Sequence, residues 1–397
     1  MILHVACLPF PSHQGTQAAL DAMLRAWSTS GRPAHLLAYT HGAYALDAPY
    51  AVHRVPDFPR VRSLRSGPTW GKVALDARGV AATRSLARRI RPSAIVAHHI
   101  EAAIVTLAAD VAPVYYVAHT SLSRELPVYL PRLPTRTVSA VAGATERWIC
   151  GRAAGVGAVA PSLAQLLPNA RYIPVPWPSR FDGPARHEAR SALDLPGDAH
   201  MCLYAGNLDH YQGWEHLLDA LTHLRRIDDN ARLLIATESE TSPVRRAARL
   251  RGIADAVDFR RLGSEHARMQ VHAAADIAWV PRRTEGGLPI KMLDAFARNV
   301  PVVAMERATA GLAVRDVCAV VQNDDPNAIA AATRRLLGAP AAAGASCARA
   351  SEYLTSRHSA DAYVDAVQSW VDADASSQAA ATPHGPRRQA APELQAR

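Results

Sequence analysis

Lysine is almost absent from this chain of 397 residues. Only two of its 44 Lys and Arg residues are lysines, Lys72 and Lys291, so arginine supplies nearly all of the positive charge. A general preference for arginine explains the depletion, but a compact ammonium and a forked guanidinium are not interchangeable ligands. The two remaining lysines are therefore candidates for positions that arginine does not serve.

Cysteine and long apolar runs are also scarce. The five cysteines are odd in number and have no paired spacing, which favours reduced thiols and argues against a zinc site. No apolar run approaches the roughly 18 residues of a membrane span, and the first residues do not resemble a secretory signal. We therefore expect a cytoplasmic protein, with two domains of ordinary size for this length.

Several common catalytic motifs are missing as well. The chain has no phosphate-binding Lys-Ser/Thr loop and no nucleophile elbow. It also lacks a Gly-x-Gly-x-x-Gly sequence that would favour a nicotinamide or flavin enzyme. These absences leave no sequence support for a resident cofactor.

Positive charge is concentrated in one segment of the first half. Between Arg54 and Arg91, ten basic residues stand against two acidic ones, a local charge of +8 within a net charge of +9. A solvated arginine-rich helix is one interpretation, and contact with an anionic membrane surface or a lipid phosphate is the other. A nucleic acid partner is the least favoured, and we do not expect one.

Strand and helix patterns alternate along the chain, which is typical of α/β domains with largely parallel sheets. The first series predicts strands at 2–8, 35–39, 94–98, 114–119, 156–160 and 172–175. Helices are predicted between them at 16–28, 70–91, 101–110, 138–150 and 163–167. The second series predicts strands at 201–205, 232–237, 257–260, 277–281, 300–304 and 319–322.

A proline-rich run from Pro174 to Pro178 separates the two series, as a linker would. We therefore place a first domain at residues 1–176, a linker at 177–200 and a second domain at 201–345. One C-terminal helix at 346–371 is expected to pack back toward the first domain. The remaining residues, 372–397, are rich in Ala, Ser, Gln, Pro and Arg and are predicted to form a disordered tail.

The most informative stretch runs from Arg283 to Ala304. Gly286 and Gly287 expose bare backbone, and Pro289 stands where the next helix begins. The free amides and positive dipole end of that helix suit a diphosphate, which the Lys291 ammonium could also reach. Asp294, one turn later, is placed to accept hydrogen bonds from ribose hydroxyls. The alternative is an ordinary loop-to-helix junction with solvated charges.

With Gly206 and Gly213 in the segment from Leu203 to Ala220, this stretch resembles the retaining glycosyltransferases of family 4, which have the GT-B fold. The resemblance covers the layout of about residues 1–370, but only the second half carries specific motifs. It implies the α/β class, with two Rossmann-like, doubly wound domains that face each other across a cleft. The first domain would bind the acceptor and the second the nucleotide-sugar donor.

The resemblance also implies roles for individual residues. Glu285 would face the donor sugar, His119 would lie beside the reacting carbon, and Lys291 would stabilise the leaving diphosphate; these three are the candidate catalytic residues. The diphosphate would contact Gly206 and Asn207, and Asp294 would bind the ribose. The full set of candidate donor-binding residues is Gly15, Gly206, Asn207, Gly286, Gly287, Leu288, Pro289 and Asp294.

Three features depart from the family pattern. Asn207 and Gln212 stand where the family commonly has Arg and Lys, and Glu285 and Asp294 are nine residues apart where eight is usual. Lys291 would supply the cation that is missing at Gln212. Arg282 or Arg283 would add a second one.

The predicted activity is metal-independent transfer of a sugar from a UDP- or GDP-sugar to an acceptor hydroxyl, with retention of configuration and no cofactor. From the basic segment, a lipid-linked or phosphorylated acceptor and a peripheral position at the inner face of the membrane are hypotheses. Two alternatives remain open. One is a catalytically degenerate GT-B protein that binds a partner, and the other is a sugar-nucleotide epimerase or hydrolase of the same fold.

Overall fold

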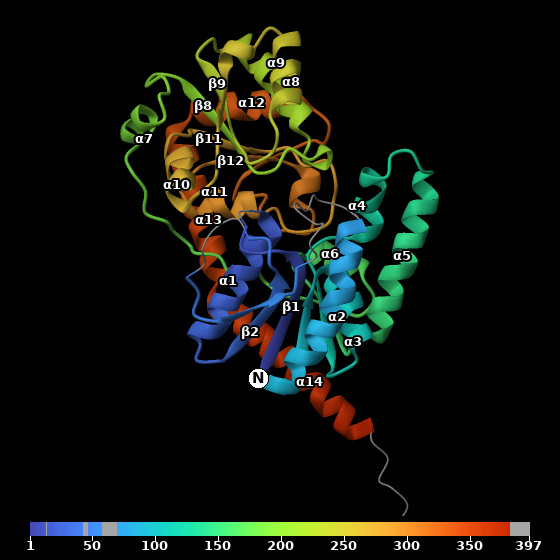
Figure 1. Cartoon of the computed structure of the whole chain (residues 1–397). Coiled ribbons are helices and arrows are strands. Elements are labelled where there is room, and N and C mark those ends of the chain that lie inside the picture. The colour runs from blue at the N-terminus through green and yellow to red at the C-terminus, as the bar shows by residue number, and fades with distance from the viewer. Residues whose placement is uncertain (13, 43–46, 58–69, 382–397) are drawn as a thin grey trace, which may run out of the picture.

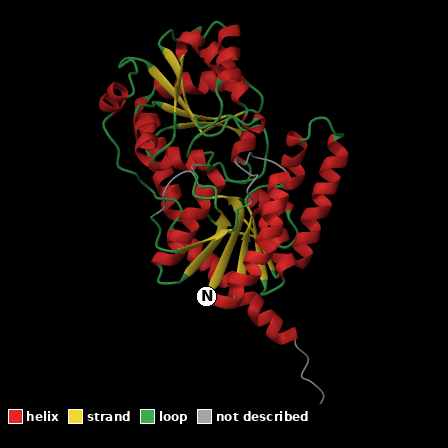
Figure 2. Ribbon diagram, viewed as in Figure 1, coloured by secondary structure: helices red, strands yellow, loops and turns green. Residues whose placement is uncertain are grey.

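The computed structural model describes residues 1–12, 14–42, 47–57 and 70–381. Within them the chain forms two parallel β-sheets, each flanked by helices (Figures 1 and 2). Strands β1 to β7 make the first sheet and β8 to β13 the second. The predicted α/β class with two successive parallel sheets is confirmed.

The first sheet has the strand order β3-β2-β1-β4-β5-β6-β7. Its central strands β4 and β5 are buried along their whole length, as expected for strands that helices cover on both faces. The strands are β1 (Ile2–Pro9), β2 (Ala34–Tyr39), β3 (Ala51–Val55), β4 (Ala94–His98), β5 (Val114–Ala118), β6 (Gly155–Ala158) and β7 (Ala170–Tyr172). The helices that follow these strands are α1 (Gly15–Thr29), α2 (Trp70–Ile90), α3 (His99–Ala109), α4 (Leu122–Tyr129), α5 (Thr135–Arg152) and α6 (Pro161–Leu166).

The second sheet has the order β10-β9-β8-β11-β12-β13. Its strands are β8 (His200–Ala205), β9 (Ala231–Ala236), β10 (Val257–Arg260), β11 (Ile277–Val280), β12 (Val302–Met305) and β13 (Ala319–Val321). The associated helices are α7 (Arg186–Ala192), α8 (Trp214–Arg225), α9 (Ser242–Leu250), α10 (Glu265–Ala273), α11 (Ile290–Ala297) and α12 (Pro326–Leu337). Short 3-10 turns are η1 (His210–Gln212), η2 (Ala254–Ala256) and η3 (Glu306–Thr309).

The C-terminal part of the chain returns to the first sheet as two helices where the sequence predicted one. These are α13 (Pro340–Arg357) and α14 (Ala360–Ala381), which are separated by His358 and Ser359. The hydroxyl of Ser359 accepts a hydrogen bond from the Ala362 amide at the start of α14. Trp370 of α14 packs edge-on against Tyr115 of β5. Helix α14 also continues past residue 372, where the predicted tail was to begin; residues 382–397 lie outside the described part.

Two elements of the first domain were not predicted. Strand β3 is a half-exposed edge strand with His53 and Arg54 in it, so it lacks the apolar pattern of the central strands. Helix α4 contains Pro127, which made the segment resemble a turn. The helix begins because the buried Glu146 carboxylate accepts the backbone amides of Leu122 and Ser123 at 2.6 and 3.3 Å. That carboxylate satisfies free amides at a helix start.

All five cysteines are free thiols, as the sequence predicted. Within the described residues, no helix combines the length and apolar character needed to cross a bilayer.

Candidate functional site

The candidate site lies where residues that follow the carboxyl ends of strands in both sheets meet. Glu285, in the loop after β11, accepts a 2.6 Å bond from Arg124 of α4. Gly287, two residues later, lies so close to the first domain that a Cβ atom there would be 2.5 Å from the backbone oxygen of His119. The structure thus brings His119, Glu285, Gly286 and Gly287 together, although 166 residues of sequence separate the first from the second.

Arg282 holds this loop in shape. Its guanidinium is buried and donates to the backbone oxygens of Gly286 and Gly287 at 2.5 and 3.3 Å. It also pairs with Glu125 of α4 at 3.2 Å, so one arginine binds the loop to the first domain. Arg283 points elsewhere, toward His210 and His216. Of the two arginines considered for a second cation, Arg282 is the one at the site.

Lys291 is in the first turn of α11, and its ammonium reaches the carboxyl end of β8. Its ammonium donates to the hydroxyl of Tyr204 and to the side-chain oxygen of Gln212, both at 2.8 Å. It also stands 4.1 Å from the centre of the Tyr204 ring. A Cβ atom on Gly206 would be 3.0 Å from it. The ammonium therefore lies beside Gln212 and Gly206, and its predicted contact with a diphosphate stays a prediction.

Burial lowers the pKa of Lys291 well below its ordinary value, and the positive charge of Arg282 lowers it further, while Asp209 acts in the opposite direction. An ammonium in this position has too little negative charge around it to offset its desolvation. An anionic ligand that entered here would supply that charge.

Asn207 follows Gly206 at the end of β8. Its backbone oxygen accepts the Tyr204 hydroxyl, and its side-chain nitrogen reaches the Tyr211 hydroxyl at 3.5 Å. The side-chain oxygen Oδ1 is buried and has no partner among the described residues. Asn207 therefore faces the same small region as Lys291, with one acceptor still unsatisfied.

Gly15, Leu288 and Pro289 mark the contact between the starts of α1 and α11. A Cβ atom on Gly15 would be 3.5 Å from Ile290, the first residue of α11. Leu288 is buried, and Pro289 is the residue before the helix. These positions lie in the contact between the two domains, beside the first backbone amides of α11. Their predicted contact with a donor stays a prediction.

Asp294 is already engaged by protein cations. Its carboxylate accepts Nε of Arg298 at 3.0 Å and lies within 4 Å of His272 and Arg268. Burial tends to raise its pKa, but the charges of these three neighbours outweigh it and lower the pKa below the ordinary value. Asp294 thus links α11 to α10, and its role as a ribose ligand remains a prediction.

Asp294→Asn is expected to lower the free energy of unfolding by about 2 kcal/mol at pH 7, because Arg298 loses a buried carboxylate partner. The folded pKa lies below the ordinary value of 3.8, so this stability is present above that value and is lost as the pH falls through the folded pKa. Urea unfolding at several pH values measures both effects. Asp182→Asn, at a fully exposed side chain, is the control. Unchanged stability with lost donor affinity would contradict the ion-pair role and favour the ribose role.

His119 is the first residue after β5 and is almost fully buried. Its Nε2 lies 3.1 Å from Nδ1 of His98. Burial lowers the pKa of His119 to about 3, with a further contribution from nearby His99. A neutral imidazole at this place offers one N–H and one lone pair but no charge.

Sequence reasoning missed several residues of the site. Arg124 and Glu125 were not among the candidate residues, yet each makes an ion pair across the domains. Tyr204 and His98 were seen only as strand residues. A strand-end position beside a polar neighbour was the available signal, but the partners of these side chains come from distant segments and are visible only in the fold.

The basic segment forms a pocket outside this site. A cavity of about 390 Å³ between β3 and α2 is lined by Arg54, Arg78 and Arg89 together with His53 and Ser85. Arg84 is used differently, since it donates to the carbonyls of Ala108 and Ala109 at the end of α3. Part of the positive charge therefore supports the fold, and part lines a surface pocket.

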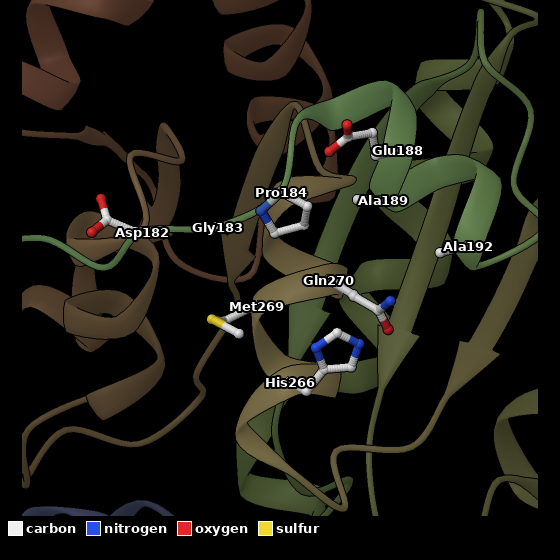
Figure 3. A pocket seen from close by; sticks show the side chains of 9 residues that line it. All are labelled: Asp182, Gly183, Pro184, Glu188, Ala189, Ala192, His266, Met269 and Gln270. Atoms are coloured by element: carbon white, nitrogen blue, oxygen red, sulfur yellow. The ribbon is translucent and has the colours of Figure 1, made fainter.

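A second surface pocket, of about 440 Å³, lies between the linker, α7 and α10 (Figure 3). Asp182 and Glu188 are on its linker and α7 side, and His266 and Gln270 extend from α10. None of the candidate site residues lines it. This pocket is therefore separate from the candidate site.

Known structures define the class of fold. Sucrose-phosphate synthase from Thermosynechococcus elongatus superposes with a TM-score of 0.76 at 18% identity, over 94% of this chain and 99% of that chain. Alr3699/HepE from Anabaena, in complex with UDP and glucose, gives 0.72 at 14% identity over the same shares. At such identities the likeness establishes the fold, which is the two-domain GT-B fold.

The sequence of the second domain is more specific. Residues 199–339 match the family described as Glycosyl transferases group 1, and this segment contains Gly206, Glu285 and Lys291. A D-inositol 3-phosphate glycosyltransferase from Catenulispora acidiphila is 31% identical over 41% of this chain. A GDP-mannose-dependent phosphatidylinositol monomannoside mannosyltransferase from Mycolicibacterium smegmatis is 33% identical, also over 41%. These matches span 40% and 45% of the two relatives.

Proposed function

We propose that this protein transfers a sugar from a nucleotide sugar to an acceptor hydroxyl. The observation that carries the proposal is the position of Lys291, a poorly compensated cation beside Gly206 and Gln212 at the end of β8. A nucleoside diphosphate is an anion that suits this place, because it would add negative charge to a site that lacks it. The glycosyltransferase match over residues 199–339 supports the same reading.

The proposed mechanism is metal-independent and retains the anomeric configuration. The bond between the anomeric carbon and the diphosphate oxygen breaks, and the acceptor oxygen bonds to the same face of that carbon. The acceptor proton passes to the departing diphosphate. Lys291 and the amides near the start of α11 would stabilise the developing charge, and Glu285 would bind a sugar hydroxyl. Catalysis is then positioning and electrostatic stabilisation.

Glu285 must change partners for this role. In the structure its carboxylate is paired with Arg124 across the domains. Both side chains are more than one third exposed, so the pair is weak and a sugar hydroxyl can displace it at little cost. Arg124 would then be free to bond the acceptor or the sugar.

For the acceptor we propose an inositol phosphate or a lipid that carries one. The names of both relatives include an inositol phosphate group, either free or within a lipid. The pocket lined by Arg54, Arg78 and Arg89 would let the first domain contact an anionic membrane surface that holds such a lipid. A cytoplasmic protein that works at the inner face of the membrane fits this proposal.

The test combines UDP-, GDP- and ADP-sugars with three acceptor classes: a neutral sugar, an inositol phosphate and a phosphoinositide in vesicles. We expect nucleoside diphosphate release from one donor base, only with a phosphate-bearing acceptor and unaffected by a chelator. Nuclear magnetic resonance of the product checks retention. Equal release without acceptor would favour a hydrolase or epimerase. Absence of donor binding would favour a partner-binding protein without catalysis.

A further inference from the structure

Three buried histidines cross the first sheet toward the site. His4 belongs to β1, His98 ends β4 and His119 follows β5, and these strands are neighbours in the sheet. Ala6 lies opposite His98, and His98 lies opposite Val117. Because side chains alternate along a strand, His4 shares a face with Ala6, and His119 stands two residues after Val117. The three rings therefore follow a diagonal on one face of the sheet.

Hydrogen bonds connect the rings in one consistent sense. Nδ1 of His4 is 3.0 Å from Nε2 of His98, and Nδ1 of His98 is 3.1 Å from Nε2 of His119. The three residues are only 0, 1 and 4% exposed. Burial lowers the pKa of His4 to about 3, and burial with the neighbouring histidines lowers the pKa of His98 well below its ordinary value. The rings are therefore neutral, and each carries a single N–H.

One N–H per ring leaves two arrangements of the protons. In the outward order, Nδ1–H of His4 donates to His98, Nδ1–H of His98 donates to His119, and His119 keeps its own Nδ1–H. In the inward order every bond is reversed, and the last N–H is on Nε2 of His4. That atom is buried with no partner among the described residues. A buried N–H without an acceptor is rarer in proteins than an acceptor without a donor, so the outward order is favoured.

We propose that His98 and His4 are positioning residues that hold His119 as the Nδ1–H tautomer, so that His119 donates a hydrogen bond to a ligand oxygen in the site. This inference rests on the proposed function, with a hydroxyl oxygen of the donor sugar as the acceptor of that bond. Within the described part of the chain, Nδ1 of His119 also has no hydrogen bond, but unlike Nε2 of His4 it is not among the buried polar atoms without a partner, so water or a ligand can reach it. His119 would therefore distinguish ligands by where they present a lone pair.

The test is the tautomer of His119 in the full-length protein without any ligand. Long-range ¹H–¹⁵N spectra of ¹⁵N-histidine protein distinguish Nδ1–H from Nε2–H, and the signals that vanish in His119→Gln assign the residue. Two isosteric variants separate the two bonds of His98. His98→Asn keeps an amide near the position of Nδ1, toward His119. His98→Gln keeps one near the position of Nε2, toward His4.

We expect Nδ1–H at His119 in the wild type and in His98→Asn, and a loss of that tautomer in His98→Gln. The value of kcat/KM for the donor should fall about tenfold in His98→Gln, and less in His98→Asn. If His98→Gln fails to fold, His4→Leu removes only the inner bond and should also weaken the tautomer preference. Nε2–H in the wild type, or one tautomer in all variants, would overturn the proposal. Because the spectra need no turnover, failure of the transferase function is detected separately.

Discussion

Replacing Lys291 with alanine is expected to lower kcat/KM for the nucleotide sugar by about 100- to 1,000-fold, the usual cost of removing one preorganised donor to a developing anion. The physical reason is that Lys291 is the cation beside Gly206 and Gln212, with its ammonium 2.8 Å from the Gln212 side-chain oxygen. The fold should persist, because the lysine is destabilised by its own burial in the unliganded protein. Calorimetry of donor binding and steady-state kinetics measure the effect.

A charge exchange provides the matched control. In Lys291→Gln with Gln212→Lys, the ammonium returns at the other end of the same hydrogen bond, where the resembled family commonly places a lysine. We expect this double variant to recover part of the activity that Lys291→Gln loses. Lys291→Arg should recover little, because the forked guanidinium does not fit a place shaped for a point charge. Equal activity in Lys291→Ala and the wild type would exclude Lys291 from the diphosphate site.

Lys291 should also couple donor binding to the uptake of protons. The pKa of Lys291 is lowered in the free protein, and a bound diphosphate would raise it again. Binding should therefore take up protons while the pH lies between the lowered pKa of the free protein and the raised pKa of the complex, and affinity should weaken as the pH rises through that range. Calorimetry in buffers of different ionisation enthalpy detects the uptake, which should vanish in Lys291→Ala.

Much of the fold follows from local pattern. The buried apolar runs of β1, β4 and β8 predicted central strands, and those of β11 and β12 did the same for the second sheet, because parallel strands covered on both faces have little choice of residue. Edge strand β3 escaped prediction because solvent contact relaxes that requirement. Helix α4 escaped because its start depends on Glu146, which lies 24 residues away.

The residues of the candidate site also fall into two groups, those that the sequence identified and those that it did not. The Gly286-Gly287 pair and Lys291 could be identified from the sequence, because a glycine pair and a rare lysine suggest a role by residue type alone. The partners of these residues were not visible, since Arg124 and Glu125 acquire their roles only when the two domains meet, and Tyr204 only when α11 packs beside β8. The buried ion pairs of Asp294 were hidden for the same reason, because Arg268 and His272 come from α10.

Gly287→Ala is expected to lower kcat/KM by about 100-fold, through misplacement of the two domains by an ångström or less. A Cβ atom at this position would lie 2.5 Å from the His119 carbonyl oxygen and 3.2 Å from Thr120. The contact is with backbone at the end of β5, so relief requires the loop after β11 to move away from the first domain. Glu285 and the α11 amides would move with the loop.

Gly286→Ala separates this contact from simple backbone strain. Both glycines have positive φ, +102° at Gly286 and +86° at Gly287, so an alanine at either position is strained by about 1 kcal/mol. At Gly286, however, the added Cβ would meet Ser121 at an ordinary 3.6 Å. Thermal unfolding should therefore shift by similar amounts in the two variants, while only Gly287→Ala loses most of the activity. If both lose it equally, the loop conformation alone matters. If only Gly287→Ala does, the closeness of the loop to His119 is the property that catalysis requires.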